Sequence, residues 1–235
     1  MNSIKEIMRD DERFPSSLTR INKCPEKLFV QGQERLLTYE RENIAIIGTR
    51  EPTKEAEKVA YSSAAMIAQK GYNIVSGMAK GCDTSAHEGC LDVEGKTIAV
   101  LAHGLDFIQK KETSLASRIC ASQGALVTEY QNDKPPQKYT FIERDRIQSG
   151  LSQVVILVQS QKKSGSMHTV KFAQEQGKKL WVYKPKGSSD SELFSGNLSL
   201  INQGNQGNLS IIDESAPRVE VFESLDDLEN LVKNL

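Results

Sequence analysis

Residues 44–76, IAIIGTREPTKEAEKVAYSSAAMIAQKGYNIVS, decide the fold class of this chain. The stretch begins with a short apolar, β-branched run at 44–48 and ends with a second apolar run at 73–76. Between these runs, residues 53–70 carry apolar side chains at intervals of three and four residues, at Ala56, Val59, Ala60, Ala64, Ile67 and Ala68. This spacing predicts one apolar face of an α-helix, and Gly71 follows it as the expected C′ glycine. The stretch therefore predicts a strand–helix–strand unit.

The same alternation of strands and helices continues to residue 183. Further strands are expected at 97–101, 125–128, 153–158 and 179–183, and further helices at 84–92, 112–122, 143–151 and 167–176. Asp83 stands where it can cap the first of these helices. Continuous apolar strands that alternate with helices indicate a parallel sheet covered on both faces. The sequence therefore predicts an α/β fold with a Rossmann-like, doubly wound, mostly parallel sheet from about residue 42 to 185.

The ends of the chain depart from this pattern. Residues 1–40 predict a short helix or loop and then an extended segment, which together form an N-terminal extension packed on the core. Residues 186–210 are rich in Ser, Asn and Gly and predict a long surface loop with a short helix near 195–202. Residues 219–235 predict a strand and a helix. We divide the chain into an N-terminal extension (1–40), a Rossmann-like core (41–212) and an acidic C-terminal strand–helix (213–235).

The charge of the chain is unevenly distributed. Thirty basic and 31 acidic residues among 235 give a formal net charge of -1, which excludes a uniformly basic protein that coats nucleic acid. Residues 213–235 carry seven acidic and two basic side chains, so they have a net charge of -5 and the remaining 212 residues have +4. The acidic segment is either a solvated C-terminal helix or a cover over a basic surface. The body retains enough positive charge for a local anion-binding pocket.

Composition excludes several other classes of protein. With 38% hydrophobic and 26% charged residues, the chain is not a disordered polyelectrolyte. The sequence contains no run of 18 apolar residues, so we expect no membrane span. Residues 1–10 lack the apolar stretch of a secretory signal. The four cysteines, Cys24, Cys82, Cys90 and Cys120, show no CxxC spacing. We therefore expect reduced cysteines, no metal site and a cytoplasmic protein.

Small and positively charged residues follow four of the predicted strands. They are Gly48-Thr49-Arg50, Ser76-Gly77-Met78-Ala79-Lys80-Gly81-Cys82-Asp83, Ala102-His103-Gly104-Leu105-Asp106 and Ser164-Gly165-Ser166-Met167-His168-Thr169. The carboxyl ends of parallel strands meet at the edge of the sheet where ligands bind, and free backbone amides at a helix N-terminus favour a phosphate. Each loop alone is better explained by turn geometry, but their repetition along one edge predicts a phosphate site.

Other motifs narrow the chemistry of this edge. The chain lacks the GxGxxG and GxxxxGK[ST] patterns, which argues against dinucleotide-dependent redox chemistry and P-loop chemistry, and we expect no cofactor. Residues 141–152, FIERDRIQSGLS, place Phe141 near Arg144 and Arg146. An aromatic ring with two arginines suits base stacking and phosphate contact on a single strand. The alternative is a helix whose arginines pair with Glu143 and Asp145.

Together these blocks resemble the DNA-processing protein A family (DprA, also called Smf). In family order, from about residue 25 to 205, they are IAIIGTREPT, IVSGMAKGCDTSAHEGCL, TIAVLAHGLD, GALVTEY, PP, FIERDRIQSGLS, VVILVQSQKKSGSMHTVKFAQEQGKKLWV and SGNLSLINQG. The SGMAKGCD…AH and RDRIQSGLS…SGS blocks are the most specific. The resemblance implies a Rossmann-like domain that usually dimerises and binds single-stranded DNA in a basic pocket at the strand ends. It also implies loading of RecA onto that DNA during natural transformation.

The resemblance also assigns the site to particular residues. It implies a first phosphate contact at Gly48, Thr49 and Arg50, and a second at Ser76, Gly77, Lys80, Gly81 and Asp83. Phe141, Arg144 and Arg146 would flank the path of the strand, and Ser164, Gly165, Ser166 and Thr169 would form the last phosphate cradle. His87 matches a family histidine, for which a hydrogen bond beneath the glycine-rich loop is a better explanation than catalysis.

The chain departs from the family pattern at several positions. Asp145 stands where the family usually has asparagine, which adds a negative charge beside the expected DNA path. His168 replaces an apolar residue in the last cradle, where it either contacts phosphate or caps the helix. The residues after Asp106 lose the family's Tyr-Pro, and His103 replaces a small residue. The chain shows no clear N-terminal helical DNA-binding domain and no C-terminal winged helix, and these departures bear on RecA loading rather than on the fold.

A wider superfamily, which includes the LOG or lysine-decarboxylase-like proteins, supplies the alternative function. LOG-type enzymes use a Gly-Gly-x-Gly-Thr-x-x-Glu block whose glutamate supports chemistry at the ribose. Phe172 occupies the glutamate position here and cannot transfer a proton, so we expect no enzymatic activity. The strand-end loops and the family resemblance together predict a protein that binds and protects single-stranded DNA, and the resemblance implies a homodimer with a RecA-type recombinase as partner. The alternative is a protein that senses or sequesters a nucleotide metabolite.

Overall fold

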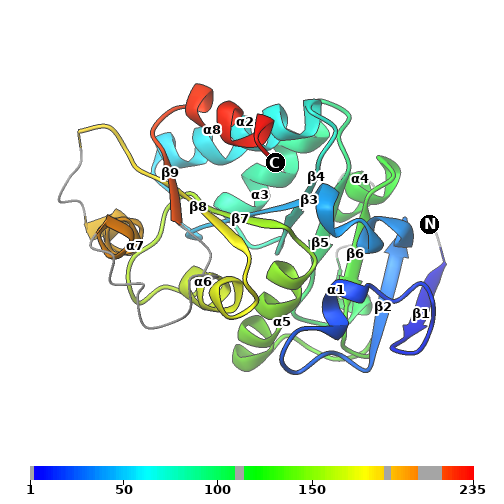
Figure 1. Ribbon diagram of the computed structural model, residues 1–235. Helices are drawn as coiled ribbons and strands as arrows, with labels where there is room; N and C mark the ends of the chain where they lie inside the picture. Colours follow the sequence, from blue (N-terminus) through cyan, green and yellow to red (C-terminus); the bar gives the residue numbers. More distant parts are fainter. Residues whose placement is uncertain (1–2, 109–113, 188–191, 206–218) are drawn as a thin grey trace.

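The computed structural model describes residues 3–108, 114–187, 192–205 and 219–235. Within these residues the strands are β1 (Ile4–Met8), β2 (Lys27–Gly32), β3 (Asn43–Ile47), β4 (Asn73–Ser76), β5 (Thr97–Val100), β6 (Ala125–Thr128), β7 (Val154–Leu157), β8 (Lys179–Tyr183) and β9 (Val219–Phe222). They form one sheet in the order β1-β2-β6-β5-β4-β3-β7-β8-β9 (Figure 1). From β6 to β9 the neighbours are parallel, whereas β2 pairs antiparallel with β1 and β6.

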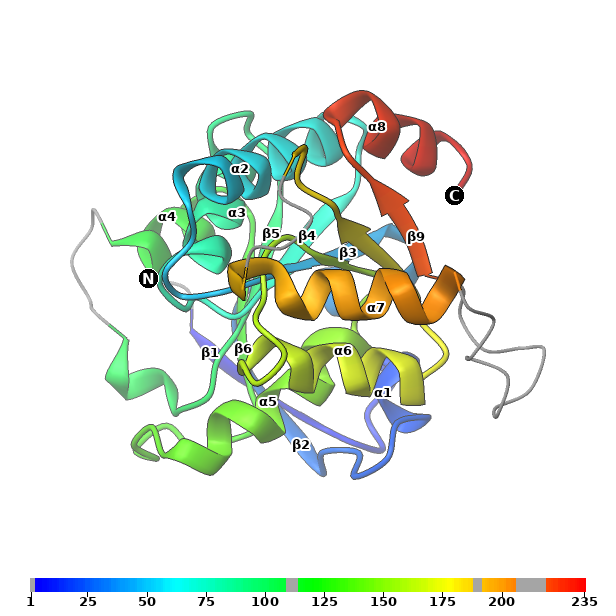
Figure 2. The ribbon, with the colours of Figure 1, turned by 90° about the vertical axis from the view of Figure 1, so that its left-hand side faces the viewer.

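Helices cover both faces of this sheet. They are α1 (Ser16–Thr19), α2 (Lys54–Gln69), α3 (Cys82–Leu91), α4 (Leu115–Ala121), α5 (Lys138–Gly150), α6 (Ser166–Glu175), α7 (Ser195–Asn205) and α8 (Leu225–Lys233). Helices α2, α3 and α8 lie over one face, and α1, α5 and α6 lie under the other (Figures 1 and 2). The predicted doubly wound α/β fold is therefore confirmed.

Alternate residues of the central strand β3 pack against opposite layers of helices. Ile44 belongs to the apolar cluster that contains Ile67 of α2, whereas Ala45 belongs to the cluster that contains Ile147 of α5. Every residue of β3 is buried. Because both faces are covered, the strand has a continuous apolar sequence rather than an alternating one.

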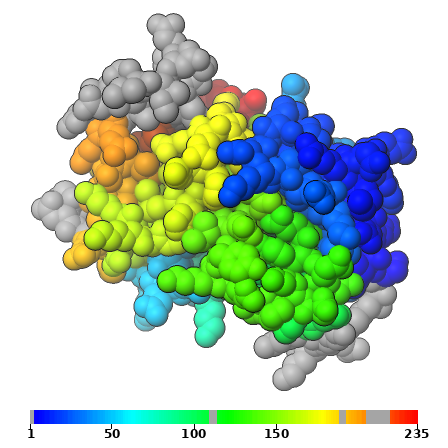
Figure 3. Space-filling model, turned by 90° about the horizontal axis from the view of Figure 1, so that it is seen from below, coloured from blue at the N-terminus to red at the C-terminus, as the bar shows by residue number. Residues whose placement is uncertain are grey.

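The N-terminal residues extend the sheet with two antiparallel strands, β1 and β2, which are joined through α1. The predicted extended segment corresponds to β2, which places Phe29 opposite Thr128 of β6. The sequence analysis did not predict β1, because this strand lies at the edge of the sheet and buries only Ile7 of its five residues. Figure 3 shows this N-terminal segment beside α5 on the lower surface of the molecule.

The C-terminal strand and helix also pack on the core. β9 pairs parallel with β8, and α8 buries Leu228 in the apolar cluster that α2 shares. Acidic side chains of this segment form ion pairs of 2.6 Å, Glu229 with Lys70 and Glu223 with Lys184. The described part of the acidic segment therefore packs on the surface of the core. Its ion pairs with Lys70 and Lys184 account for two of its acidic side chains without a cover over a basic surface.

Several predicted boundaries differ from the structure. Helix α5 begins at Lys138, five residues before the predicted start, because Gln137 and Thr140 form a capping box ahead of a polar first turn. Helix α7 extends the predicted 195–202 helix to Asn205. The domain boundaries at 40 and 212 stay predictions, and the second lies outside the described residues.

The described residues bear on three features of the chain: its cysteines, possible metal ligands and membrane-spanning helices. The four cysteines are free thiols. In the described ranges, no three His, Cys, Asp or Glu side chains are grouped as a metal site would require. No described helix has both the length and the apolar composition needed to cross a lipid bilayer.

Candidate functional site

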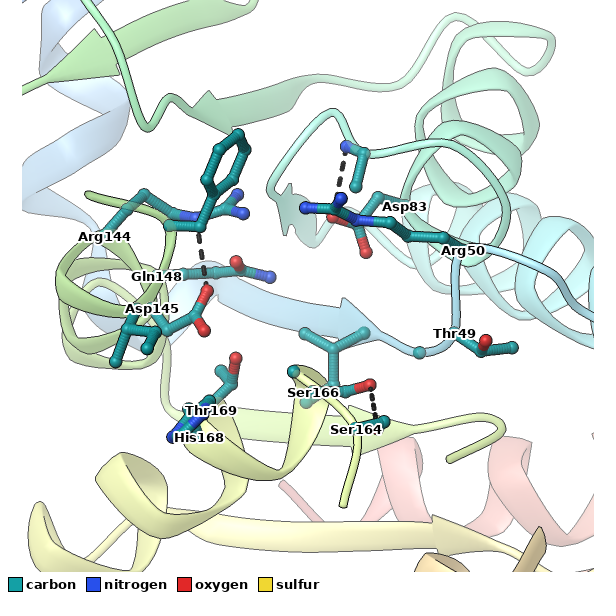
Figure 4. A pocket seen from close by; sticks show the side chains of 16 residues that line it. Thr49, Arg50, Asp83, Arg144, Asp145, Gln148, Ser164, Ser166, His168 and Thr169 are labelled. Carbon is teal, nitrogen blue, oxygen red and sulfur yellow. Dashed lines mark hydrogen bonds and ion pairs between the residues drawn. The ribbon is translucent and has the colours of Figure 1, made fainter. Parts of the chain in front are cut away.

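A pocket of about 410 Å³ lies at the carboxyl ends of the central strands (Figure 4). The loop after β3, the loop between β4 and α3, one face of α5 and the N-terminal end of α6 form its walls. Its lining residues are Ile47, Gly48, Thr49, Arg50, Ala79, Asp83, Phe141, Ile142, Arg144, Asp145, Gln148, Ser164, Gly165, Ser166, His168 and Thr169. The predicted residues outside this lining are Ser76, Gly77, Lys80, Gly81 and Arg146.

The loop after β3 places a cation at the mouth of the pocket. Gly48 has no room for a side chain, because an added Cβ would lie 2.4 Å from Cys82 Sγ. The Thr49 amide donates to the Gln159 carbonyl at 2.8 Å, which fixes the direction of the loop. Arg50 is exposed, and its Cζ lies 5.0 Å from the centre of the Phe141 ring. The mouth therefore combines a guanidinium group with an aromatic face.

The loop between β4 and α3 is closed on itself. The amides of Gly77 and Ala79 donate to the Asp83 carboxylate at 3.1 and 3.3 Å. The prediction that Asp83 caps α3 is therefore wrong. The helix starts at Cys82 with Gly81 as its N-cap, so Asp83 lies inside the first turn and its carboxylate turns back to the loop. These two amides are occupied and cannot cradle a phosphate.

The remaining predicted residues of this loop lie around it rather than in the pocket lining. Ser76 is buried and its hydroxyl donates to the Ile46 carbonyl at 2.7 Å. Gly81 has φ of 82°, and an added Cβ would lie 2.5 Å from the Thr49 carbonyl oxygen. Lys80 is exposed. Most of this loop therefore supports the neighbouring segments of the pocket.

The loop before α6 is open. Helix α6 begins at Ser166, and its N-cap Gly165 supplies no side-chain hydrogen bond. In the described part of the chain, the amides of Gly165 and Ser166 have no hydrogen-bond partner. An added Cβ at Gly165 would meet no atom of the described residues within 4 Å. Because packing does not require glycine here, its effect is to leave the amides accessible at the positive end of the helix dipole.

Polar side chains surround this open helix N-terminus. Ser164 Oγ lies 3.2 Å from Ser166 Oγ and within hydrogen-bond distance of Ser160 Oγ. His168 is exposed and lines the pocket, whereas Thr169 is buried at its floor. Because Gly165 is the N-cap, His168 does not cap the helix.

Helix α5 separates the two arginines that the sequence analysis grouped. Arg144 lines the pocket, and its Nη1 donates to the Val100 carbonyl at 2.9 Å. Arg146 instead forms two hydrogen bonds to Glu129, at 2.6 and 2.7 Å, on another side of the helix. Residues two apart on a helix do not share a face. The expectation that Arg146 flanks the same path as Arg144 therefore conflicts with its position.

The alternative prediction, that the two arginines pair with Glu143 and Asp145, holds for one of the two acidic residues. Arg144 Nε lies 3.2 Å from Asp145 Oδ1. Arg146 does not pair with the Glu143 carboxylate, although it donates to the Glu143 backbone carbonyl at 2.6 Å.

The floor of the pocket is acidic and buried. Burial raises the pKa of Asp145 to about 7; Arg144 opposes this rise, Asp83 adds to it, and Thr169 and Arg50 oppose it. Burial also raises the pKa of Asp83, against the attraction of Arg144. Asp145 and Gln148 line the pocket but are not among the site residues predicted from the sequence. Their spacing from Phe141 and Arg144 at helical intervals was the available signal.

His87 has a structural role. It is fully buried, and its Nδ1 lies 2.7 Å from Thr97 Oγ1. Burial and the nearby Arg144 lower the pKa of His87 to about 3, so the ring is neutral. Because the Thr97 hydroxyl donates to the Ile74 carbonyl at 2.8 Å, it accepts the proton of His87 Nδ1.

A family model described as DNA recombination-mediator protein A matches residues 5–217. The chain belongs to this family. Among curated relatives, the DNA processing protein DprA of Bacillus subtilis is 37% identical over 201 residues, which cover 86% of this chain and 67% of that protein. Protein Smf of Escherichia coli is 36% identical over 84% of this chain and 52% of its own length. The chain thus spans between half and two thirds of these relatives.

Solved structures of DprA proteins share the fold. DprA from Streptococcus pneumoniae superposes with a TM-score of 0.81 at 29% identity, over 97% of this chain and 74% of that chain. DprA from Helicobacter pylori, described with a single-stranded DNA binding mode, gives a TM-score of 0.80 at 28% identity, over 99% and 97% of the two chains. A molybdenum cofactor binding protein from Rippkaea orientalis shows the fold alone, at 20% identity, a TM-score of 0.55 and coverage of 82% and 95%.

Proposed function

We propose that this DprA-family chain binds single-stranded DNA in the pocket, with a backbone phosphate at the open N-terminus of α6. The observation that carries the proposal is the Arg50–Phe141 pair at the mouth, opposite the accessible amides of Gly165 and Ser166. A single strand offers both phosphates and unstacked bases, so it needs cations and an aromatic face. A duplex keeps its bases stacked inside and gives no such face to Phe141.

Family membership supports the biological setting of this proposal. The Bacillus subtilis relative is named a DNA processing protein, and the Helicobacter pylori DNA processing protein A is described with a single-stranded DNA binding mode. We extend the proposal to protection of the strand, to a RecA-type recombinase as partner, and to a cytoplasmic homodimer acting in DNA uptake and recombination. These finer parts rest on the family resemblance.

A nucleotide metabolite is the second candidate ligand. It is favoured by the size of the pocket, because about 410 Å³ lies within the usual range for one small molecule. The same phosphate cradle serves a free nucleotide and a strand. Competition between an oligonucleotide and mononucleotides on one protein preparation separates the two, because a strand-binding protein gains affinity from several linked phosphates.

We also propose that the pocket binds its ligand without cleaving it. Phe172 replaces the glutamate of the LOG-type block, and Glu175 is exposed and pairs with Lys171 at 3.7 Å. His87 is buried away from solvent. Release of a free base from a nucleoside monophosphate by the purified chain, and its loss in Asp145→Asn, would overturn this part of the proposal.

Salt-dependent binding of a labelled oligothymidine tests the main proposal. Arg50→Ala should weaken binding by about tenfold and flatten the dependence on salt, because one charge at the pocket is lost. Lys80→Ala, an exposed cation outside the pocket lining, is the matched control and should weaken binding less. Absence of binding at low salt, or a tight preference for duplex, would contradict the proposal.

A further inference from the structure

The floor of the pocket carries hydrogen-bonding groups that a phosphate at α6 does not use. Asp145 and Gln148 lie one turn apart on α5, and both point into the pocket (Figure 4). Their exposed fractions are 8% and 2%. Gln148 Nε2 is buried and has no hydrogen-bond partner among the described residues. A buried donor of this kind costs free energy, which an acceptor on a ligand would recover.

The charge of the floor argues against a second phosphate there. Asp83 and Asp145 both interact with one buried cation, Arg144, so the floor has one acidic group more than it has basic groups. Arg144 Nη1 is already bound to the Val100 carbonyl. A phosphate at this depth would approach the Asp145 carboxylate and be repelled.

The composition of the pocket walls suits a flat, uncharged ring. Ile47 is buried and Ala79 is half-buried, and Phe141 adds its ring at the mouth, so the walls offer apolar side chains beside the acidic floor. The cation and the open amides are at the mouth and at α6, where a sugar–phosphate chain would lie. An entering nucleotide therefore places its base toward Asp145 and Gln148.

We propose that the floor selects guanine: the Asp145 carboxylate accepts hydrogen bonds from guanine N1–H and the 2-amino group, while the Gln148 amide donates to O6. This inference rests on the proposed function of the pocket. Among the four bases, only the pairing edge of guanine presents an acceptor followed by two donors. Adenine, cytosine and thymine each turn at least one acceptor toward an ionised Asp145, which leaves a buried group unpaired.

Protonation of Asp145 should set the strength of this preference. The charged and polar groups that interact with Asp145 are Arg144 on its own helix, Asp83 on α3, Arg50 after β3 and Thr169 on α6; His168 also lines the pocket. Burial raises the pKa of Asp145 to about 7, so near neutral pH the carboxyl is partly protonated. Guanine needs the ionised form, so its binding releases a proton and strengthens as the pH rises.

Fluorescence anisotropy with two short strands tests the proposal. One strand is oligothymidine, and the other carries isolated guanines flanked by thymines, so that it cannot form a quadruplex. At about pH 8 the guanine strand should bind about tenfold more tightly, and at about pH 6 the ratio should fall. Hypoxanthine in place of guanine lacks the 2-amino group and should reduce the ratio to about threefold.

Two variants distinguish the specific effect of Asp145 on guanine binding from the effect of removing any negative charge from α5. Asp145→Asn should bind both strands with nearly equal affinity at either pH, because its amide offers one acceptor in place of two. Glu143→Gln removes an acidic group from the same helix outside the pocket lining, where Glu143 accepts from the Tyr130 hydroxyl at 2.8 Å. This control should keep the guanine preference of the unmodified chain.

The possible results distinguish failure of guanine selection from failure of the proposed binding of single-stranded DNA. Equal binding of the two strands by the unmodified chain, or a guanine preference that survives in Asp145→Asn, would overturn the inference and leave the proposed function in place. Failure of both strands to bind would overturn the proposed function and the inference together.

Discussion

The two glycine-rich loops at the pocket have similar compositions and different structures. In the loop at residues 77–81, the amides of Gly77 and Ala79 are bound to Asp83, and an added Cβ at Gly77 would lie 1.5 Å from Arg144 Nη1. In the loop at residues 164–166, an added Cβ at Gly165 would meet no described atom within 4 Å, and the amides at the start of α6 stay accessible.

This difference shows that glycine serves packing in one loop and leaves backbone amides accessible in the other. Gly77 makes room for a buried arginine whose removal would leave Asp83 and Asp145 without their shared cation. Gly165 makes room for no other described residue. We therefore expect substitutions in the first loop to change stability and substitutions in the second to change binding.

The largest expected effect breaks the closed loop. Gly77→Ala forces the Arg144 guanidinium to move, so the free energy of unfolding should fall by about 3–5 kcal/mol, as when a buried ion pair is broken. Denaturant unfolding followed by circular dichroism measures the change. Gly165→Ala is the matched control and should alter stability by less than about 0.5 kcal/mol. Equal stability of the two variants would contradict the comparison.

A somewhat smaller effect is expected at the arginine that belongs to neither loop. Arg146→Met leaves Glu129 without its partner and should lower the free energy of unfolding by about 2–3 kcal/mol. Because Arg146 lies outside the pocket lining, the folded variant should bind oligothymidine as the unmodified chain does. A loss of affinity without a loss of stability would return Arg146 to the interface.

The sequence predicted the parallel core well for a physical reason. Strands such as β3 and β7 are buried on both faces, so their apolar runs are unambiguous. The edge strand β1 buries one residue of five and gave no such signal. The start of α5 was hidden because its first two residues, Lys138 and Tyr139, are exposed and the buried third residue, Thr140, is polar.

The candidate site was predictable in outline and not in its internal contacts. Strand-end loops identified the edge of the sheet, and most of the predicted residues line one pocket. Sequence could not show that Asp83 would occupy the amides of its own loop, since both loops offer glycine before a helix. Nor did it show that Arg146 would turn to Glu129, which lies 17 residues away in the chain.

A pH-dependent effect sharpens the comparison at Asp145, which lies between the two loops. Burial raises its folded pKa from 3.8 to about 7, so the folded chain keeps a proton that the unfolded chain loses. The associated stability is full below about pH 4 and is lost as the pH rises through about 7. Asp145→Asn removes this loss and should be more stable than the unmodified chain by about 1–2 kcal/mol at about pH 8.

Thermal unfolding across this pH range checks the sign of the effect. Below about pH 3 the variant and the unmodified chain should have the same stability, because Asp145 is then mostly protonated in both the folded and the unfolded state. Asp133→Asn, at an exposed loop position, serves as the control and should show no such crossover. Greater stability of the unmodified chain at about pH 8 would show that the ion pair with Arg144 outweighs burial.

The most direct test of the open loop is oligothymidine affinity in two variants at one position. Gly165→Asp and Gly165→Asn place side chains of nearly equal size where an added Cβ meets no described atom within 4 Å, so both variants should fold about as stably as the unmodified chain. The aspartate adds a negative charge where we place the phosphate, so it should bind about tenfold more weakly than the asparagine variant at low salt. Equal affinities, with both variants folded, would contradict the claim that the N-terminus of α6 holds the strand.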